Sequence, residues 1–250
     1  MKFPLNRNPK VNKTKEKSYL SIDIGTEYIK TAVFIVEGNE VSIIGYNRMK
    51  QKESNMYAAF IINIEDVKDI VDKSIGESIN SAKSYFESTY SLPEEAIVGI
   101  AGELVQGVTV LVNMERENPQ RSIDQREVND LISKVKLHTF EGTKEDIAIE
   151  TGISVSQVQE IDTYINSVFI DGVRVTNPLG YKGTELIYRV FSTFAPKIHI
   201  ESLDRVVNEL GLRMRKLVVE PYAISLGLND LRSNDTSGII IDIGGGTTDV

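Results

Sequence analysis

Residues 238–249, Gly-Ile-Ile-Ile-Asp-Ile-Gly-Gly-Gly-Thr-Thr-Asp, are predicted to form an apolar strand that runs into a triple-glycine turn. The turn carries a carboxylate, Asp242, on one side and two hydroxyls, Thr247 and Thr248, on the other. Residues 19–26, Tyr-Leu-Ser-Ile-Asp-Ile-Gly-Thr, repeat this plan near the other end of the chain. Two such turns can clamp one phosphate chain, because glycine lets successive backbone N–H groups face the phosphate oxygens.

Each turn supplies the groups that a phosphate and magnesium site needs. Asp23 and Asp242 are candidate Mg²⁺ ligands, partly through water, because Mg²⁺ keeps several waters and takes few carboxylates. The candidate phosphate contacts are Gly25, Thr26, Gly244, Gly245, Gly246, Thr247 and Thr248. A lone Asp-x-Gly-Thr also ends ordinary strands, but two of them, each directly after an apolar strand, favour the phosphate site.

The composition limits the classes of protein. A chain of 250 residues with 41% hydrophobic residues can bury a sizeable core in one large or two smaller domains. Its formal charge of -8 argues against a nucleic-acid binder, which needs a cationic surface to displace counterions from phosphates. The lack of cysteine excludes disulfides and thiolate metal sites and fits a cytoplasmic protein. No apolar run approaches the roughly 20 residues that span a bilayer.

Residues 1–17 are predicted to form a disordered tail, because five lysines and one arginine face the single acid Glu16. Such a tail is either a solvated leader or a contact for anionic lipid or an acidic partner.

Residues 18–103 are interpreted as the first part of a lobe. Strands are expected in an antiparallel meander at 19–24, 28–36 and 41–46. Apolar residues at helical spacing from Val67 to Phe86 predict a long helix that lies on this sheet. A further short buried strand is expected at 96–100.

Residues 104–196 differ in their pattern of expected elements and are interpreted as an inserted subdomain with the order strand, helix, strand, strand. Ser122 and Gln125 have the spacing of a capping box, which predicts a helix that begins there. The strands are expected at 105–112, 165–170 and 185–194.

Segment 141–162 of the insert allows two interpretations. Ala148, Gly152 and Val158 have the spacing of a helix-turn-helix, but the acids of the segment outnumber its one lysine, so DNA phosphates would repel it. The alternative is a helical hairpin that decorates the subdomain.

Residues 197–250 return to alternating strands and helices, the pattern of an α/β domain. A strand is expected at 197–200, followed by a helix that Ser202 caps and Gly211 ends. A short strand then leads to a helix whose first turn holds Pro221, and the last strand leads into the triple-glycine turn.

The two glycine turns resemble the two phosphate hairpins of the actin-like ATPase superfamily, which includes actin, heat-shock chaperones, MreB and sugar kinases. Residues 219–223, Val-Glu-Pro-Tyr-Ala, resemble the Glu-Pro-x-Ala that opens the connecting helix in the chaperone and MreB branches. The resemblance implies an actin-like, ribonuclease H-like α/β lobe that binds ATP with Mg²⁺. It also implies that Glu220 positions the attacking water, that Asp249 assists it, and that Lys30 reaches the phosphates.

Each of these three residues also has a purely structural interpretation. Glu220 is an acid of the kind that the helix dipole favours at a helix N-terminus. Lys30 is otherwise a solvated strand lysine, and Asp249 a charge at a strand edge.

The insert resembles that of the FtsA family, through Ile170-Asp-Gly and the segment 176–183, Thr-Asn-Pro-Leu-Gly-Tyr-Lys-Gly. The resemblance covers roughly residues 18–250. It implies a cytoplasmic protein at the inner face of the cell membrane that binds ATP, hydrolyses it slowly or not at all, and scaffolds or tethers FtsZ. It further implies contacts with other division proteins and self-association into filaments. A PilM-like platform for type IV pilus assembly shares the subdomain and is the alternative, with an actin-superfamily small-molecule kinase as the third.

The second half of an actin-like fold is expected after Val250, with the adenosine pocket and the C-terminal membrane helix of the FtsA family. The chain is therefore interpreted as an N-terminal fragment. We expect residues 1–250 alone to bind ATP weakly or not at all.

Overall fold

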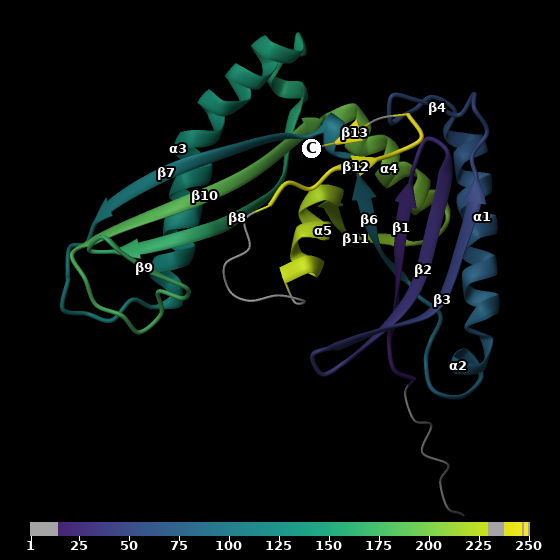
Figure 1. Ribbon diagram of the computed structural model, residues 1–250, viewed down its shortest axis with the longest axis horizontal. Coiled ribbons are helices and arrows are strands. Elements are labelled where there is room, and N and C mark those ends of the chain that lie inside the picture. The colour runs from purple at the N-terminus through teal and green to yellow at the C-terminus, as the bar shows by residue number, and fades with distance from the viewer. Residues whose placement is uncertain (1–14, 230–237, 247, 250) are drawn as a thin grey trace, which may run out of the picture.

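A computed structural model describes residues 15–229, 238–246 and 248–249. In it the chain is built around two main β-sheets (Figure 1). The larger sheet has five strands in the order β11-β6-β1-β2-β3. Its strands are β1 Ser18–Ile24, β2 Tyr28–Glu37, β3 Glu40–Lys50, β6 Glu95–Ile100 and β11 Arg213–Val219. The first three form the predicted antiparallel meander, whereas β6 runs parallel to β1 and β11 runs parallel to β6.

Two helices, α1 (Ile64–Ser81) and α4 (Lys197–Glu209), pack on one face of this sheet and share its core. Strand residues alternate between faces, so Leu20 and Ile22 of β1 are fully buried against the helices. Thr31 Oγ1 donates to the carbonyl oxygen of Ser74 in α1 at 3.0 Å, which satisfies a hydroxyl inside the core. The residues between the buried ones, Asp23 and Lys30 among them, emerge on the opposite face.

Shorter elements complete this lobe. The predicted long helix ends at Ser81 and is followed by the separate α2 (Lys83–Ser88). A small hairpin is formed by β4 (Met56–Tyr57) and β5 (Phe60–Ile61). At the start of the described chain, Glu16 N donates to the carbonyl oxygen of Thr89 at 3.0 Å, and Glu16 O accepts from Ser91 N at 2.8 Å. Residues 1–14 of the predicted tail lie outside the described residues.

Between β6 and α4 the chain builds a second sheet in the order β7-β10-β8-β9. Its elements are η1 Gly102–Leu104, β7 Gln106–Glu115, α3 Gln125–Thr151, η2 Val155–Gln157, β8 Val158–Ile170, β9 Val173–Val175 and β10 Glu185–Pro196. Helix α3 packs its apolar residues against this sheet in a core separate from the first (Figure 1). The predicted order of strand, helix, strand and strand is present, with the short β9 added.

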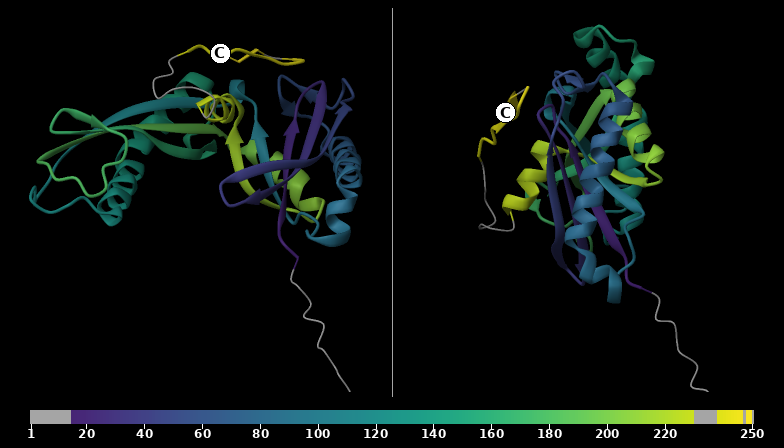
Figure 2. Two further views of the ribbon diagram at one scale, coloured as in Figure 1. Left: turned by 60° about the horizontal axis from the view of Figure 1, so that its bottom comes forward. Right: turned by 90° about the vertical axis from the view of Figure 1, so that its right-hand side faces the viewer.

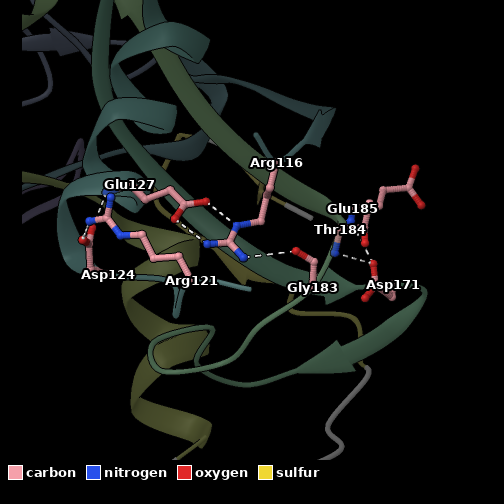
Figure 3. Close-up of polar contacts among 8 residues, drawn as sticks. All are labelled: Arg116, Arg121, Asp124, Glu127, Asp171, Gly183, Thr184 and Glu185. Atoms are coloured by element: carbon pink, nitrogen blue, oxygen red, sulfur yellow. Dashed lines mark hydrogen bonds and ion pairs between the residues drawn. The ribbon is translucent and has the colours of Figure 1, made fainter. Parts of the chain in front are cut away.

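Arg116 fastens the end of β7 to the start of α3 (Figure 3). Its side chain is 3% exposed and donates to both carboxylate oxygens of Glu127, from Nε at 2.6 Å and from Nη2 at 2.9 Å. Nη1 donates to the carbonyl oxygen of Gly183 at 3.1 Å. One buried guanidinium therefore holds β7, α3 and the loop before β10 together.

The interpretation of segment 141–162 as a helical hairpin is wrong. Helix α3 is continuous to Thr151, and Gly152 ends it with a left-handed φ of 73° while its N–H donates to Ala148 O at 2.9 Å. After one short 3-10 turn, η2, strand β8 begins at Val158, so no second α-helix follows α3 in this segment and the helix-turn-helix interpretation is wrong as well. Ile147 is buried in the core of the insert, which explains why α3 continues this far.

The start of α3 also differs from the expectation. Asp124, not Ser122, is the N-cap, and its Oδ1 accepts from Glu127 N at 2.9 Å. The cap therefore lies two positions later than the predicted one.

The predicted strand at 197–200 is wrong, because these residues form the first turn of α4. Adjacent residues His199 and Ile200 are both buried, which a helix stripe allows and an alternating strand does not. Ser202 lies within the helix, where its Oγ donates to Ile198 O at 2.7 Å, so it is not the cap. The stop at Gly211 is confirmed by its φ of 73°.

The last part of the described chain begins with α5 (Glu220–Asn229), which follows β11 without a loop. The predicted apolar strand before the triple glycine, at 238–241, is wrong, because these residues lie in no strand and Ile239 is exposed rather than buried in the sheet. Strands β12 (Asp242–Ile243) and β13 (Thr248–Asp249) pair with each other and, among the described residues, with no other strand. Figure 2 shows this hairpin outside the five-stranded sheet. Among the described residues, no helix combines the length and the apolar character needed to cross a membrane.

Candidate functional site

The candidate site lies at the edge of the five-stranded sheet where three parallel strands end. Strands β1, β6 and β11 run in the same direction, so their carboxyl ends lie side by side. Asp23 of β1 and Gly99 of β6 are next to last in their strands and lie on the face opposite α1 and α4. Glu220 follows β11 as the first residue of α5. The topology therefore gathers predicted residues from distant parts of the sequence at one edge.

Asp23 and Lys30 face each other across β1 and β2. Lys30 Nζ donates to Asp23 Oδ2 at 2.7 Å, and the lysine side chain is about half exposed. The hydrogen bond to Asp23 raises the pKa of Lys30, partial burial opposes this shift, and the charges of Asp23, Glu220 and Asp242 raise it further. Asp23 therefore contacts the ammonium group directly, whereas Glu220 and Asp242 act on it through their charges.

Glu220 is directed over the sheet by a glycine in the neighbouring strand. A Cβ added at Gly99 would lie 2.5 Å from Glu220 Oε1 and 3.2 Å from its Cδ. The carboxylate therefore rests over β6, in the space that a side chain at position 99 would fill. A residue larger than glycine there would displace it.

The two glycine turns meet. A Cβ at Gly246 would lie 3.1 Å from Thr26 Oγ1, and one at Gly245 would lie 2.4 Å from Glu27 Cβ. In the first turn, Gly25 N donates to Tyr28 O at 3.0 Å. Glycine is required in the second turn because a side chain would prevent this close approach.

For the other predicted site residues that it describes, the structure gives only the strand pairing or the exposure. Gly244 and Thr248 are exposed, and Thr248 is opposite Ile243 in the β12–β13 hairpin. Asp249 is opposite Asp242 in that hairpin, but its side chain lies outside the described part of the structure. Thr247 also lies outside the described residues.

The arrangement fits a magnesium-bound phosphate chain in its donor types. Asp23 and Asp242 offer the oxygen ligands that Mg²⁺ prefers, the turns offer backbone N–H groups, and Lys30 offers a cation. Within the described residues, no three His, Cys, Asp or Glu side chains converge as a metal site made by protein alone. A site for Mg²⁺ that arrives with phosphate needs fewer protein ligands, since the ion keeps waters and phosphate oxygens.

Sequence reasoning missed three neighbours of the site. Glu27 contacts the second turn, although it directly follows the first motif, and Gly99 lies hidden in an apolar strand. Arg48 is opposite Lys30 in β3, and its Cζ lies 3.5 Å from the centroid of the Tyr28 ring. The strand register would have identified Arg48, but the contact between Gly99 and Glu220 depends on which strands become neighbours.

Comparison with known proteins gives relatives that share one name. The chain is 26% identical over 246 residues to the cell division protein FtsA of Neisseria meningitidis serogroup B, across 94% of this chain and 52% of the relative. It is 21% identical over 238 residues to the cell division protein FtsA of Streptococcus pneumoniae serotype 2, across 94% of this chain and 47% of the relative. The chain thus spans about half the length of these relatives. No protein-family model matches it.

Among solved structures, the chain is similar to one in a PilM-PilN type IV pilus biogenesis complex, with a TM-score of 0.52 and 12% identity. The similarity covers 85% of this chain and 50% of that chain. At this level of identity, the likeness is one of fold.

Proposed function

We propose that this chain, which falls in the FtsA/PilM branch of the actin-like ATPase superfamily, supplies the phosphate-binding half of a nucleotide-binding cell division protein. Its fold is the α/β lobe of that superfamily with an α+β unit inserted between β6 and α4. The observation that carries the proposal is the ion pair of Asp23 with Lys30 beside the place where the two glycine turns meet, with the charges of Glu220 and Asp242 also acting on Lys30.

The proposed ligand is ATP with Mg²⁺. Asp23 and Asp242 would hold the ion, mostly through its waters, and Mg²⁺ would neutralise phosphate charge when bound. The backbone of Gly25 and of residues 244–246 would bind phosphate oxygens, with hydroxyls from Thr26, Thr247 and Thr248. Lys30 would exchange its bond to Asp23 for a phosphate oxygen.

Hydrolysis is proposed to be slow or absent. Glu220 would orient a water beside the terminal phosphate, with Asp249 assisting, because carboxylates accept hydrogen bonds from an attacking water. A site that binds nucleotide without rapid turnover suits a scaffold whose state changes with occupancy.

The proposed partners are FtsZ, other division proteins and further copies of the same protein. The proposed location is the cytoplasmic face of the cell membrane, reached through a C-terminal segment. The insert, residues 104–196, is proposed as the contact module. The fold similarity to a chain of the PilM-PilN complex supports a pilus-assembly platform as the second candidate.

Sedimentation of the full-length protein with FtsZ filaments distinguishes these candidates. We expect a larger share of it to pellet with Mg-ATP when FtsZ filaments are present than when FtsZ is left out. Capture by a short peptide of a pilus membrane protein, with no binding to FtsZ, would favour the platform. ATP consumption only after a sugar is added would contradict both and indicate a kinase.

A further inference from the structure

The insert joins the five-stranded sheet through a contact between β8, β11 and the start of α5. Lys216 Nζ in β11 lies 2.5 Å from Asp162 Oδ2 in β8. The same Nζ lies 5.5 Å from the ring centroid of Tyr164, within cation–π range. The centroid of the Tyr164 ring lies 4.0 Å from the centroid of the Tyr222 ring in α5. These four residues, Asp162, Tyr164, Lys216 and Tyr222, are called the junction cluster.

Register shifts interrupt the pairing of both strands next to these side chains. In β8 the pairing with β10 passes over Ile161, and in β11 the pairing with β6 passes over Arg215. Bulges re-aim side chains and often lie next to functional sites. Ile161 packs against the core of the five-stranded sheet although its own strand belongs to the second sheet. The two units therefore share packing at the bulge and do not merely touch.

The charged groups of the junction cluster, Lys216 and Asp162, are partly buried. Burial and the hydrogen bond with Asp162 raise the pKa of Tyr164, which keeps its hydroxyl protonated. Burial acts to raise the pKa of Asp162, but the hydrogen bonds from Lys216 and Tyr164 outweigh it and hold the pKa below its ordinary value. The Asp162 carboxyl group is therefore ionised at neutral pH.

The junction cluster connects the insert to the candidate site over a very short path. Tyr222 lies two residues after Glu220 in the first turn of α5. Consecutive residues of one helical turn share its backbone hydrogen bonds, so a displacement of this end of α5 moves the Tyr222 and Glu220 backbones together.

We propose that Tyr164 and Lys216 are positioning residues for Glu220, so that the orientation of the insert and the binding of nucleotide depend on each other. The inference rests on the proposed function, because Glu220 meets phosphate only if the site binds nucleotide. Coupling of this kind is reciprocal. A nucleotide that shifts Glu220 turns the insert, and a partner that fixes the insert alters nucleotide affinity by the same factor.

Two spin labels in the full-length protein test this coupling. Residues 1–250 contain no cysteine, so Lys73→Cys in α1 and Ser133→Cys in α3, both at exposed positions, give defined attachment points once any further cysteine is replaced by serine. Pulsed electron paramagnetic resonance measures the distance between the labels with and without a non-hydrolysable Mg-ATP analogue. The affinity for the analogue is measured on the same samples.

We expect a narrow distance distribution that shifts when the analogue binds. Tyr164→Ala and Lys216→Met should broaden the distribution, remove the shift and change the affinity several-fold. Tyr164→Phe loses the hydroxyl but keeps the ring that contacts Lys216 and Tyr222, so it should retain the shift. Arg189→Ala, an exposed position on β10 outside the junction cluster, is the matched control and should behave as wild type.

Two outcomes overturn the inference while the proposed function stands. One is a wild-type protein that binds the analogue without any shift in distance. The other is a pair of variants, Tyr164→Ala and Lys216→Met, that both keep the wild-type distribution and its shift. If the wild type binds no analogue, the affinity measurement identifies that failure, and the proposed function and the inference fall together.

Discussion

Glu220 Oε1 lies 2.5 Å from the point that a Cβ on Gly99 would occupy. Glu220 is the first residue of α5 and directly follows β11, and Gly99 lies in β6, the strand that pairs with β11. The short distance exists because β6 lies next to β11 in the sheet and because Gly99 has no side chain on the face of Asp23. Position 99 therefore controls where the carboxylate of Glu220 rests.

Gly99→Ala should displace Glu220 while leaving the fold intact. The added methyl group meets a flexible side chain and not backbone, so we expect the melting temperature to change little. The Glu220 carboxylate must leave the strand, so Mg-ATP turnover in the full-length protein should fall further than Mg-ATP affinity. Equal turnover in Gly99→Ala and the wild type, at a measurable wild-type rate, would contradict this placement.

Lys30 reports on the acids of the site without any nucleotide. Its raised pKa leaves less free amine, so acetylation of Lys30 should be slow. Asp23→Asn should accelerate it most, because Asp23 provides the hydrogen bond, and Glu220→Gln and Asp242→Asn should accelerate it less. Mass spectrometry of the Lys30 peptide, with Lys73 on α1 as the internal control, measures these rates. Unchanged acetylation in all three variants would place the acids elsewhere.

Local sequence signals predicted the parts of the fold whose cause is local. The antiparallel meander follows from alternating strands joined by short turns, and the stop at Gly211 follows from its left-handed φ. The wrong strand at 197–200 and the wrong hairpin within 141–162 both arose where burial against distant residues decided the outcome. Helical burial of His199 and Ile200 requires the neighbouring elements, which no short window of sequence contains.

The candidate site also has a part that the local sequence predicts and a part that depends on which strands become neighbours. The glycine turns were visible as motifs, and the structure brings Thr26 close to Gly246. The placement of Glu220 over Gly99 could not be predicted, because it needs the parallel pairing of β6 with β11. The junction cluster lies next to two register shifts, at Ile161 and Arg215, which leave no recognisable pattern in the sequence.

Arg116→Ala should destabilise the insert. Removal of the guanidinium leaves Glu127 without its partner, and we expect a loss of roughly 3 kcal/mol, near the low end for one member of a buried ion pair because Glu127 retains some solvent contact. Arg121→Ala removes an exposed ion pair with Asp124 and should cost far less, because solvent screens such pairs. Urea unfolding followed by circular dichroism measures both, and equal losses would contradict the structural role of Arg116.

His199 should make the lobe sensitive to mild acid. Burial lowers its pKa from 6.5 to about 4, so the unfolded chain takes up the proton first as the pH falls. The contribution of neutral His199 to the free energy of unfolding is fully present above about pH 6.5. It declines toward pH 4, by at most about 1.4 kcal/mol per pH unit. His199→Gln removes this titration and should flatten the dependence between these limits in denaturant unfolding series. An equally steep decline in the variant would assign the acid sensitivity to other groups.

Asp242 is proposed to complete a phosphate site with Asp23, and this role can be measured as the affinity of the full-length protein for Mg-ATP. Isothermal titration should show binding by the wild type and a loss of at least about tenfold, or about 1.4 kcal/mol, in Asp242→Asn. Asp146→Asn removes one exposed acid from α3 and should leave the affinity unchanged. Wild-type affinity in Asp242→Asn would contradict the account.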